Sequence, residues 1–269
     1  MRGISRTSIE DLRESLVAKA SGPRIAVTVG EEMFAVVRLV DSEHGLRRAL
    51  ADPAKSGAEK AAITRQLLHG KISDRTDDLV AEAVTARWAS PGDLSDALEE
   101  LAIEAYVLNA EYERKLDDLE DDLFRFARVI AGQPDLRMAF TSSAPAAMKQ
   151  ELVRNLLNGK VEGTALTLIT QVVTNPRGRA PQTALDVAAQ VAAKRREQLL
   201  ATVRVAAPLS ATQRRRLQAA LQESYGRSVH LNVVLDPSVI GGMSVQIGDE
   251  LIDGTAASRL GDVRRRLAS

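Results

Sequence analysis

The stretch that decides the fold runs from Leu231 to Leu267 and reads LNVVLDPSVIGGMSVQIGDELIDGTAASRLGDVRRRL. Around its start, apolar and polar residues alternate over 229–235, a period of two that is typical of a β-strand. A second alternating run covers 202–205, just upstream. The two residues Gly248 and Asp249 lie between SVQI and ELID and predict a tight hairpin in which Val245 faces Ile252.

Between the two alternating runs, the sequence predicts a helix that passes through Leu217, Leu221 and Tyr225. Ser210 and Gln213 have the spacing of a capping box, in which each side chain satisfies a backbone amide at the start of a helix. A last helix is expected over about 255–267. Residues 200–269 are therefore predicted to form a small α/β unit.

Four glycines of this stretch have structural explanations. Gly241 and Gly242 permit a bulge or a sharp bend, Gly248 permits the hairpin, and Gly254 ends a strand before the last helix. None of these roles involves chemistry. The stretch therefore encodes a fold, and it points to no reaction.

Upstream, the sequence contains an internal repeat. The pattern RQLLHGK at 65–71 returns as RNLLNGK at 154–160, and the wider comparison of 34–85 with the chain 90 and then 89 residues later gives 13 identities in 52 positions. Gly70 and Gly159 follow a Leu-Leu pair in both copies and are expected to end a helix in the left-handed conformation. We infer a duplicated helical module of about 90 residues, and call residues 1–95 copy 1 and residues 96–199 copy 2.

Further helix ends are predicted where Thr7 with Glu10 and Ser56 with Glu59 fit the capping box. Loops are expected at 90–93 and 175–181, which contain Pro and Gly. Between the copies, apolar residues recur every three or four positions from Leu98 to Ile130, as on one face of a helix. If uninterrupted over 94–131, that helix would be about 57 Å long at roughly 1.5 Å per residue.

The outer face of this predicted helix is acidic. Its acidic residues are Glu111, Glu113, Asp117, Asp118, Glu120, Asp121 and Asp122. A solvated helix surface explains such a run most simply, and a docking face for a basic partner is the alternative.

Composition excludes several classes of function. The 36 basic and 36 acidic residues cancel, which argues against general binding to nucleic acid or to an anionic membrane. The chain has no cysteine, so disulfides, thiolate catalysis and cysteine zinc sites are absent. No stretch is apolar and long enough to span a membrane, and Glu10 and Asp11 stand where a signal peptide would be apolar. We expect a soluble protein that stays inside the cell.

No motif for catalysis or for a cofactor is found in the sequence. The patterns of dinucleotide, nucleotide-phosphate and hydrolase-elbow sites are missing. His44, His69 and His230 have no neighbours with metal-ligand spacing. We expect His44 and His69 to be surface or helix-end residues, and a structural role is predicted for His230. Basic residues collect over 177–227, but without interleaved aromatics an RNA groove is the weaker reading and a helix-end or partner-facing role the stronger.

The 231–267 stretch resembles the C-terminal signature of the delta subunits of F-type ATP synthases, the family of the mitochondrial oligomycin-sensitivity-conferring protein. Thr255 stands where the family usually has serine, and either hydroxyl can cap the last helix. The residues that carry the resemblance are Asp236, Ile240, Gly241, Gly242, Gly248, Asp249, Ile252, Asp253, Gly254, Thr255, Arg259 and Leu260.

The resemblance implies a helical bundle followed by the α/β unit over about 96–269, with residues 1–95 as an addition. The expected fold class is thus mainly α, with two tandem helical-bundle modules before a small α/β C-terminal unit. By resemblance, the chain is a non-catalytic stator subunit without a cofactor, at the cytoplasmic face of the bacterial membrane.

The partners that the resemblance implies are the N-terminal helices of the alpha subunits and the membrane-anchored b subunits. The alpha helix would bind in a groove of copy 2, whose Leu136, Phe140, Leu156, Leu157 and Leu168 are expected to be core rather than contact residues. A free-standing helical adaptor is the alternative function. It would explain the repeat but not the long C-terminal match.

Overall fold

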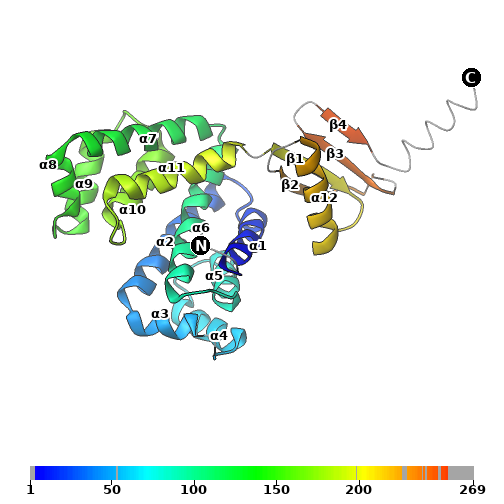
Figure 1. The fold of residues 1–269 in the computed structure, drawn as a ribbon, viewed down its shortest axis with the longest axis horizontal. Coiled ribbons are helices and arrows are strands. Elements are labelled where there is room, and N and C mark those ends of the chain that lie inside the picture. Colours follow the sequence, from blue (N-terminus) through cyan, green and yellow to red (C-terminus); the bar gives the residue numbers. More distant parts are fainter. Residues whose placement is uncertain are drawn as a thin grey trace, which may run out of the picture. The chain divides into compact units, whose positions relative to one another are not determined.

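The structure is a computed structural model that describes residues 4–52, 54–197, 199–225, 229–237, 239, 241–247 and 250–253. The chain divides into two compact units, residues 1–193 and 194–269 (Figure 1). The division predicted between 95 and 96 falls inside a helix of the first unit, while that between 199 and 200 lies near the division into units. No helix of the described residues is both long and apolar enough to cross a membrane.

The first unit is entirely helical over its described residues. Its helices are α1 (Ile4–Lys19), α2 (Pro23–Ser42), α3 (His44–Ala51), α4 (Gly57–Leu68), α5 (Asp74–Thr85), α6 (Pro91–Tyr112), α7 (Leu116–Gly132), α8 (Pro134–Thr141), α9 (Ala146–Leu157), α10 (Gly163–Thr174) and α11 (Pro181–Glu197). One continuous hydrophobic core extends through them from Ile9 to Ala192. Copy 1 and copy 2 therefore share a core.

The repeat seen in the sequence returns in the helix bounds. Adding 90 to the bounds of α3 gives those of α8, and adding 89 to those of α4 and α5 gives those of α9 and α10. Both Gly70 (φ 70°) and Gly159 (φ 72°) adopt the left-handed conformation just after a helix, as predicted. Pro91 and Pro181, also 90 residues apart, both stand at the first position of a helix.

Helix α6 belongs to both copies. As the last helix of copy 1, it is equivalent to α11 of copy 2. As the first helix of copy 2, it precedes α7 and is equivalent to α1, which precedes α2 in copy 1. Every residue from Leu101 to Ala110 is buried. The one-sided apolar seam predicted for this region was therefore wrong for α6, because helices of copy 1 and copy 2 cover it on all sides.

The long helix considered over 94–131 is broken in two. Arg114 takes the left-handed conformation (φ 59°), where glycine is usual. The amide of Lys115 donates to the carbonyl of Ala110 (2.7 Å) and that of Arg114 donates to the carbonyl of Glu111 (3.0 Å). These two bonds form a Schellman motif, which closes α6 and lets α7 begin in a new direction.

Helix starts were predicted with mixed success. Ser56 and Glu59 form the capping box at the start of α4. The cap predicted at Thr7 was wrong, because α1 already begins at Ile4. Two other helices are capped by carboxylates from distant parts of the chain. Glu32 of α2 accepts a hydrogen bond from the amide of Ser73 before α5 (3.0 Å). Asp122, which is 90 positions after Glu32, accepts one from the amide of Glu162 before α10 (3.1 Å).

The second unit contains β1 (Leu199–Val205), α12 (Ala211–Tyr225), β2 (Val229–Leu235), β3 (Met243–Ile247) and β4 (Glu250–Asp253). The strand order is β2-β1-β3-β4, with β1 and β2 parallel and the other pairs antiparallel. Val245 pairs with Ile252 as predicted. Ser210 and Gln213 exchange the predicted capping hydrogen bonds before α12.

The mainly α fold with a small α/β C-terminal unit is thus as expected. The helix predicted for 255–267 and the Gly248-Asp249 turn lie outside the described residues.

Candidate partner-binding site

Five of the predicted signature residues are described, and they shape the turn and the hairpin of the second unit. Asp236 follows β2, and its amide donates to the carbonyl of Val205 (2.9 Å). Gly241 (φ 62°) and Gly242 (φ 91°) have the left-handed backbone of the predicted bend and lead into β3. Ile252 and Asp253 pair with β3. The other signature residues lie outside the described residues: Ile240, Gly248, Asp249, Gly254, Thr255, Arg259 and Leu260.

The two edge strands of this sheet expose apolar side chains. Val234 and Leu235 lie on β2, and Leu251 and Ile252 lie on β4. The face with Ala201 and Val203 forms the core with Leu221 of α12. Leu235 and Ile252 lie on this same face, paired with Val205 and Val245, at the two edges of the sheet. Exposed apolar side chains on an edge strand mark a surface that a partner can cover.

In the first unit, large exposed apolar side chains gather in one part of the chain. All those found among its described residues lie between 112 and 148, and none lies in copy 1. They are Tyr112, Phe124, Val129, Met138 and Met148. Over the described residues, copy 2 therefore exposes large apolar side chains and copy 1 does not.

A groove lies between α7 and α11 within copy 2, and its cavity volume is about 410 Å³. We call it the α7–α11 groove. It is lined by Glu120, Asp121 and Phe124 of α7 and by Asp186, Ala189, Gln190 and Ala193 of α11. The side chain of Phe124 is 50% exposed, and the guanidinium of Arg128 lies 5.7 Å from the centre of its ring.

The expected core residues of copy 2 do pack inward. Phe140 and Leu168 are fully buried and Leu157 is buried, while Leu136 and Leu156 are half-buried against the same core. The acidic residues over 111–122, which were expected on a solvated face, are mostly exposed. Asp122 is buried and accepts a hydrogen bond from the amide of Glu162.

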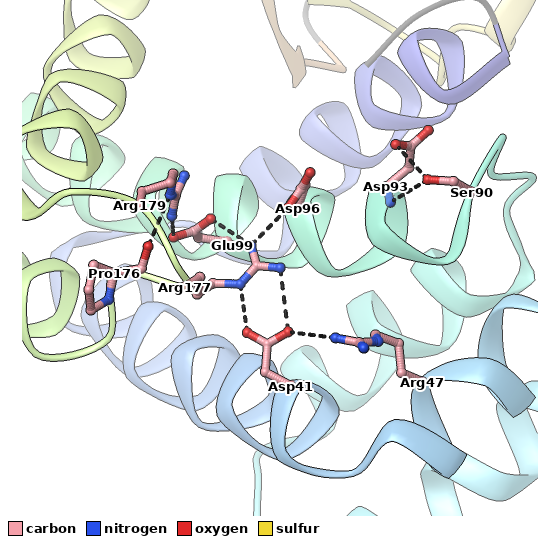
Figure 2. A network of polar contacts seen from close by, with 9 residues as sticks. All are labelled: Asp41, Arg47, Ser90, Asp93, Asp96, Glu99, Pro176, Arg177 and Arg179. Atoms are coloured by element: carbon pink, nitrogen blue, oxygen red, sulfur yellow. Dashed lines mark hydrogen bonds and ion pairs between the residues drawn. The ribbon is translucent and has the colours of Figure 1, made fainter. Parts of the chain in front are cut away.

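Two residues of the predicted basic cluster over 177–227, Arg177 and Arg179, form ion pairs within the first unit. In Figure 2, Arg177 of the α10–α11 loop reaches Asp41 of α2 (Nε to Oδ2, 2.6 Å) and Glu99 of α6 (Nη1 to Oε2, 2.7 Å). Arg179 binds the other oxygen of Glu99, which is only 5% exposed. The network joins the last loop of copy 2 to copy 1 and to the shared helix.

The surroundings of Arg177 stabilise the charged form of its guanidinium. Burial lowers the pKa of Arg177, but the hydrogen bond to Asp41 and the charge of Glu99 outweigh it, so the pKa is raised above its ordinary value. Arg177 also has a left-handed backbone (φ 53°), followed by Gly178 (φ 76°), which turns the loop toward α6. The network holds structure together and has no reacting group.

The described residues contain no group of three His, Asp or Glu side chains arranged to hold a metal ion. His44 and His69 are exposed at a helix start and a helix end. The sequence did not predict this groove, although Phe124 occupies the position of Phe34 in the repeat, 90 residues later. The sequence does contain a difference between the copies at this place, because Gly30 aligns with Glu120 in the repeat.

Comparison with known proteins agrees with a role in an assembly. The sequence model of the family described as ATP synthase delta (OSCP) subunit matches residues 94–267. The ATP synthase subunit delta of Thermobifida fusca is 47% identical over 269 residues, which cover 100% of both chains. That of Streptomyces griseus is 44% identical, again over 100% of both chains.

A chain in the structure of the Toxoplasma gondii mitochondrial ATP synthase hexamer is 22% identical and covers 62% of this chain and 95% of its own length. Its TM-score of 0.27 is too low to compare the two folds. The bacterial relatives align from end to end, so they share copy 1 as well as the part that the family model matches.

Proposed function

Because the chain belongs to the ATP synthase delta (OSCP) subunit family, whose members are non-catalytic subunits of the synthase, we propose that it is the stator link of the enzyme's peripheral stalk. In this role it joins the catalytic head, through N-terminal helices of the alpha subunits, to the membrane-anchored b subunits. It would act at the cytoplasmic face of the bacterial membrane without spanning it.

One observation carries the proposal. The match to the family begins at residue 94, near the start of the shared helix α6, and continues to residue 267. It therefore includes copy 2 and the α/β unit together. An isolated helical module could resemble many adaptors, but both parts in this order are typical of the family.

The exposed apolar surfaces support a division of labour. We assign the alpha-subunit helix to copy 2, which exposes Phe124, Val129 and Met138. We assign the b subunits to the second unit, whose edge strands expose Leu235 and Leu251. A chain with exposed apolar side chains on each of two compact units is suited to hold two partners at once.

A stator needs tight contacts and no chemistry. Its task is to keep the head from turning with the rotor, so that ion flow drives conformational change at the nucleotide sites. Nanomolar association corresponds to about 12 kcal/mol, which a well-packed interface of roughly 1,600 Å² can supply. A rigid first unit serves this task, and its single core and its Arg177 network give it rigidity.

Copurification tests the proposal against the adaptor alternative. The full chain, tagged at one end, is purified from detergent-solubilised membranes of the native bacterium. A stator subunit brings down alpha, beta and b subunits in fixed ratio, whereas an adaptor brings down other proteins. Recovery of the chain without alpha and beta subunits would refute the stator function.

A further inference from the structure

We propose that a hollow in copy 1 binds an acidic segment of another polypeptide of the synthase, with an apolar side chain of that segment packed beside Trp88. The hollow is bordered by the end of α3, the loop before α4 and the loop before α6, and its cavity volume is about 520 Å³. We call it the copy 1 hollow. The inference rests on the proposed function and goes beyond it, because that function assigns partners only to copy 2 and to the second unit.

The apolar part of the copy 1 hollow includes an aromatic ring that is fixed in place. Ala49 and Ala51 of α3, Trp88, and Pro91 at the start of α6 all line the hollow. The indole of Trp88 is half-buried and packs against the core of the first unit. Its Nε1 donates a hydrogen bond to the carbonyl of Ala83 (2.7 Å). Because the ring is already ordered, an apolar side chain can pack beside it with little loss of conformational entropy.

Two basic side chains border the hollow and are not neutralised. Arg48, on the last turn of α3, and Lys55, in the loop before α4, are both exposed and both line it. Among the described residues, neither forms an ion pair or a side-chain hydrogen bond. The pKa of Glu59 is lowered mainly by hydrogen bonds from Ser56, and the charge of Lys55 adds to this to a smaller extent. Both basic groups can therefore bind a carboxylate without first breaking another ion pair.

The other polar groups around the hollow already have partners. The Oδ1 atom of Asp52 accepts a hydrogen bond from the amide of Ala54 (2.9 Å). The first turn of α6 is capped, because the hydroxyl of Ser90 accepts from the amide of Asp93 (3.3 Å) and donates to the carboxylate of Asp93 (3.1 Å). The attraction of the hollow for an anion therefore comes from its two basic side chains, which outnumber the one carboxylate of its lining.

The repeat shows that these two charges belong to copy 1 alone. Arg48 corresponds to Met138 in copy 2, 90 residues later. Lys55 corresponds to Ala144 or Pro145, according to where the one-residue gap is placed. Copy 2 nevertheless forms the same helices here, since α8 and α9 repeat the bounds of α3 and α4. The fold therefore does not need the two charges, and their place beside a fixed aromatic ring points to recognition of a partner.

The exposure of the hollow favours a peptide segment over a small molecule as its occupant. Most of its lining residues are exposed, among them Arg48, Lys55, Ala89 and Pro91. Small-molecule sites usually enclose most of their ligand, which a hollow with such an exposed lining does not do. A peptide segment can cross it with one apolar side chain beside Trp88 and its carboxylates beside the two basic groups. A basic segment would be repelled by the same two groups.

Photo-cross-linking in the intact complex tests the inference. The full chain carries p-benzoylphenylalanine in place of Ala89, which is exposed and lines the hollow. It is purified with the synthase and irradiated, and the adduct is sequenced by mass spectrometry. We expect an adduct on a segment of another synthase subunit in which Asp or Glu residues flank an apolar one. The same substitution at Ala62, which is exposed on α4 outside the lining, is the control and should not label that segment.

Binding of a synthetic peptide with the cross-linked sequence, made without tryptophan, then measures the charge contribution. Trp88 is the only tryptophan of the chain, so its fluorescence reports binding to the full chain. Arg48→Met together with Lys55→Ala, which removes both charges, should weaken binding about tenfold. Arg24→Met, at an exposed position of α2 outside the lining, should leave it unchanged. A peptide with Asn and Gln in place of Asp and Glu should bind the wild-type chain about tenfold more weakly and should not distinguish it from the double variant.

Failure of the hollow and failure of the function give different results. If the chain copurifies with alpha and beta subunits but position 89 labels nothing, or labels a segment without carboxylates, the inference is wrong and the stator function stands. Equal peptide binding by the wild-type chain and the double variant would also overturn the inference. A change in Trp88 fluorescence with inorganic phosphate but not with the peptide would assign the hollow to a small anion instead. If the wild-type chain does not copurify with the synthase, the inference and the function both fail.

Discussion

At the scale of single residues, one glycine and its replacement separate the two copies. Gly30 brings α2 against α6, and Glu120 at the equivalent position accompanies an open groove. The repeat alignment alone places these residues opposite each other. Only the packing of Tyr106 beside Gly30 explains why the difference matters, because a sequence does not state how closely two helices approach.

Gly30→Ala should destabilise the chain although alanine favours a helix. The new Cβ would overlap the buried ring of Tyr106, and such overpacking costs about 1 to 3 kcal/mol, against a gain in helix propensity of about 1 kcal/mol. The net change is a loss of up to about 2 kcal/mol in the free energy of unfolding, measured in urea. Gly45→Ala, on α3 with no atom within 4 Å of the new Cβ, should leave it unchanged or slightly raise it. Equal effects of the two substitutions would contradict the close packing at Gly30.

Arg177 makes the strongest case for a residue that joins the copies. Its guanidinium contacts carboxylates of α2 and α6, and Glu99 is too buried to be solvated alone. Sequence analysis placed Arg177 in a basic cluster with a helix-end or partner-facing role. Its acidic partners lie 78 and 136 positions away, which no local pattern could indicate.

Arg177→Ala should lower the free energy of unfolding by about 2 to 3 kcal/mol. Breaking a buried ion pair typically costs about 3 to 5 kcal/mol, and we expect less here because Arg179 still binds Glu99. Arg125→Ala is the matched control, since Arg125 is 69% exposed beside Asp121 and should contribute less than about 0.5 kcal/mol. Urea unfolding followed by circular dichroism measures both. A loss no larger than that of the control would show that the network adds little stability.

At the scale of elements, most helices and strands could be predicted from local patterns. The caps at Ser56 and Ser210, the helix ends at Gly70 and Gly159, and the pairing of Val245 with Ile252 all follow from short-range chemistry. Apart from the cap predicted at Thr7 of α1, the errors concern α6. Its break at Arg114 places a non-glycine residue in a glycine-favoured conformation, and its burial on all sides depends on helices from two copies.

An ion pair links the start of α10 to the start of α7 and predicts a pH dependence. Glu162 caps α10 by accepting from the amide of Thr164 and forms an ion pair with Lys115, which precedes α7. The hydrogen bond from Lys115 is the main cause that lowers the pKa of Glu162 below its ordinary value of 4.5. Since the folded state favours the charged form, this stabilisation is present above pH 4.5 and is lost as the pH falls through the lowered pKa.

Glu162→Gln should therefore be less stable than wild type at pH 7, and the difference should shrink on acidification below about pH 4.5. Unfolding midpoints in urea at pH 7 and pH 3 measure it. In a chain that carries Lys115→Met, the effect of Glu162→Gln should be smaller at pH 7, because the main cause of the pKa shift is gone. A difference between wild type and Glu162→Gln that grows toward pH 3 would contradict this account.

At the scale of the whole molecule, the duplication gives two copies with different surfaces. Over its described residues, copy 1 has no large apolar side chain that is fully exposed, and it shares α6 with copy 2, whereas copy 2 exposes Phe124 and Met138 among others. The fold class could be read from the repeat and the C-terminal stretch. The unequal surfaces could not, because exposure is decided by which helix pairs close, and that depends on contacts between distant residues.

The central claim is that this chain catalyses no reaction and links the catalytic head to the membrane-anchored part of the synthase. Membrane vesicles stripped of the head and of this chain, then given back purified head with or without the chain, test it most directly through ATP-driven ion pumping. We predict that the added head hydrolyses ATP in both cases and pumps ions only when the full chain is present. Equal pumping without the chain would contradict the claim.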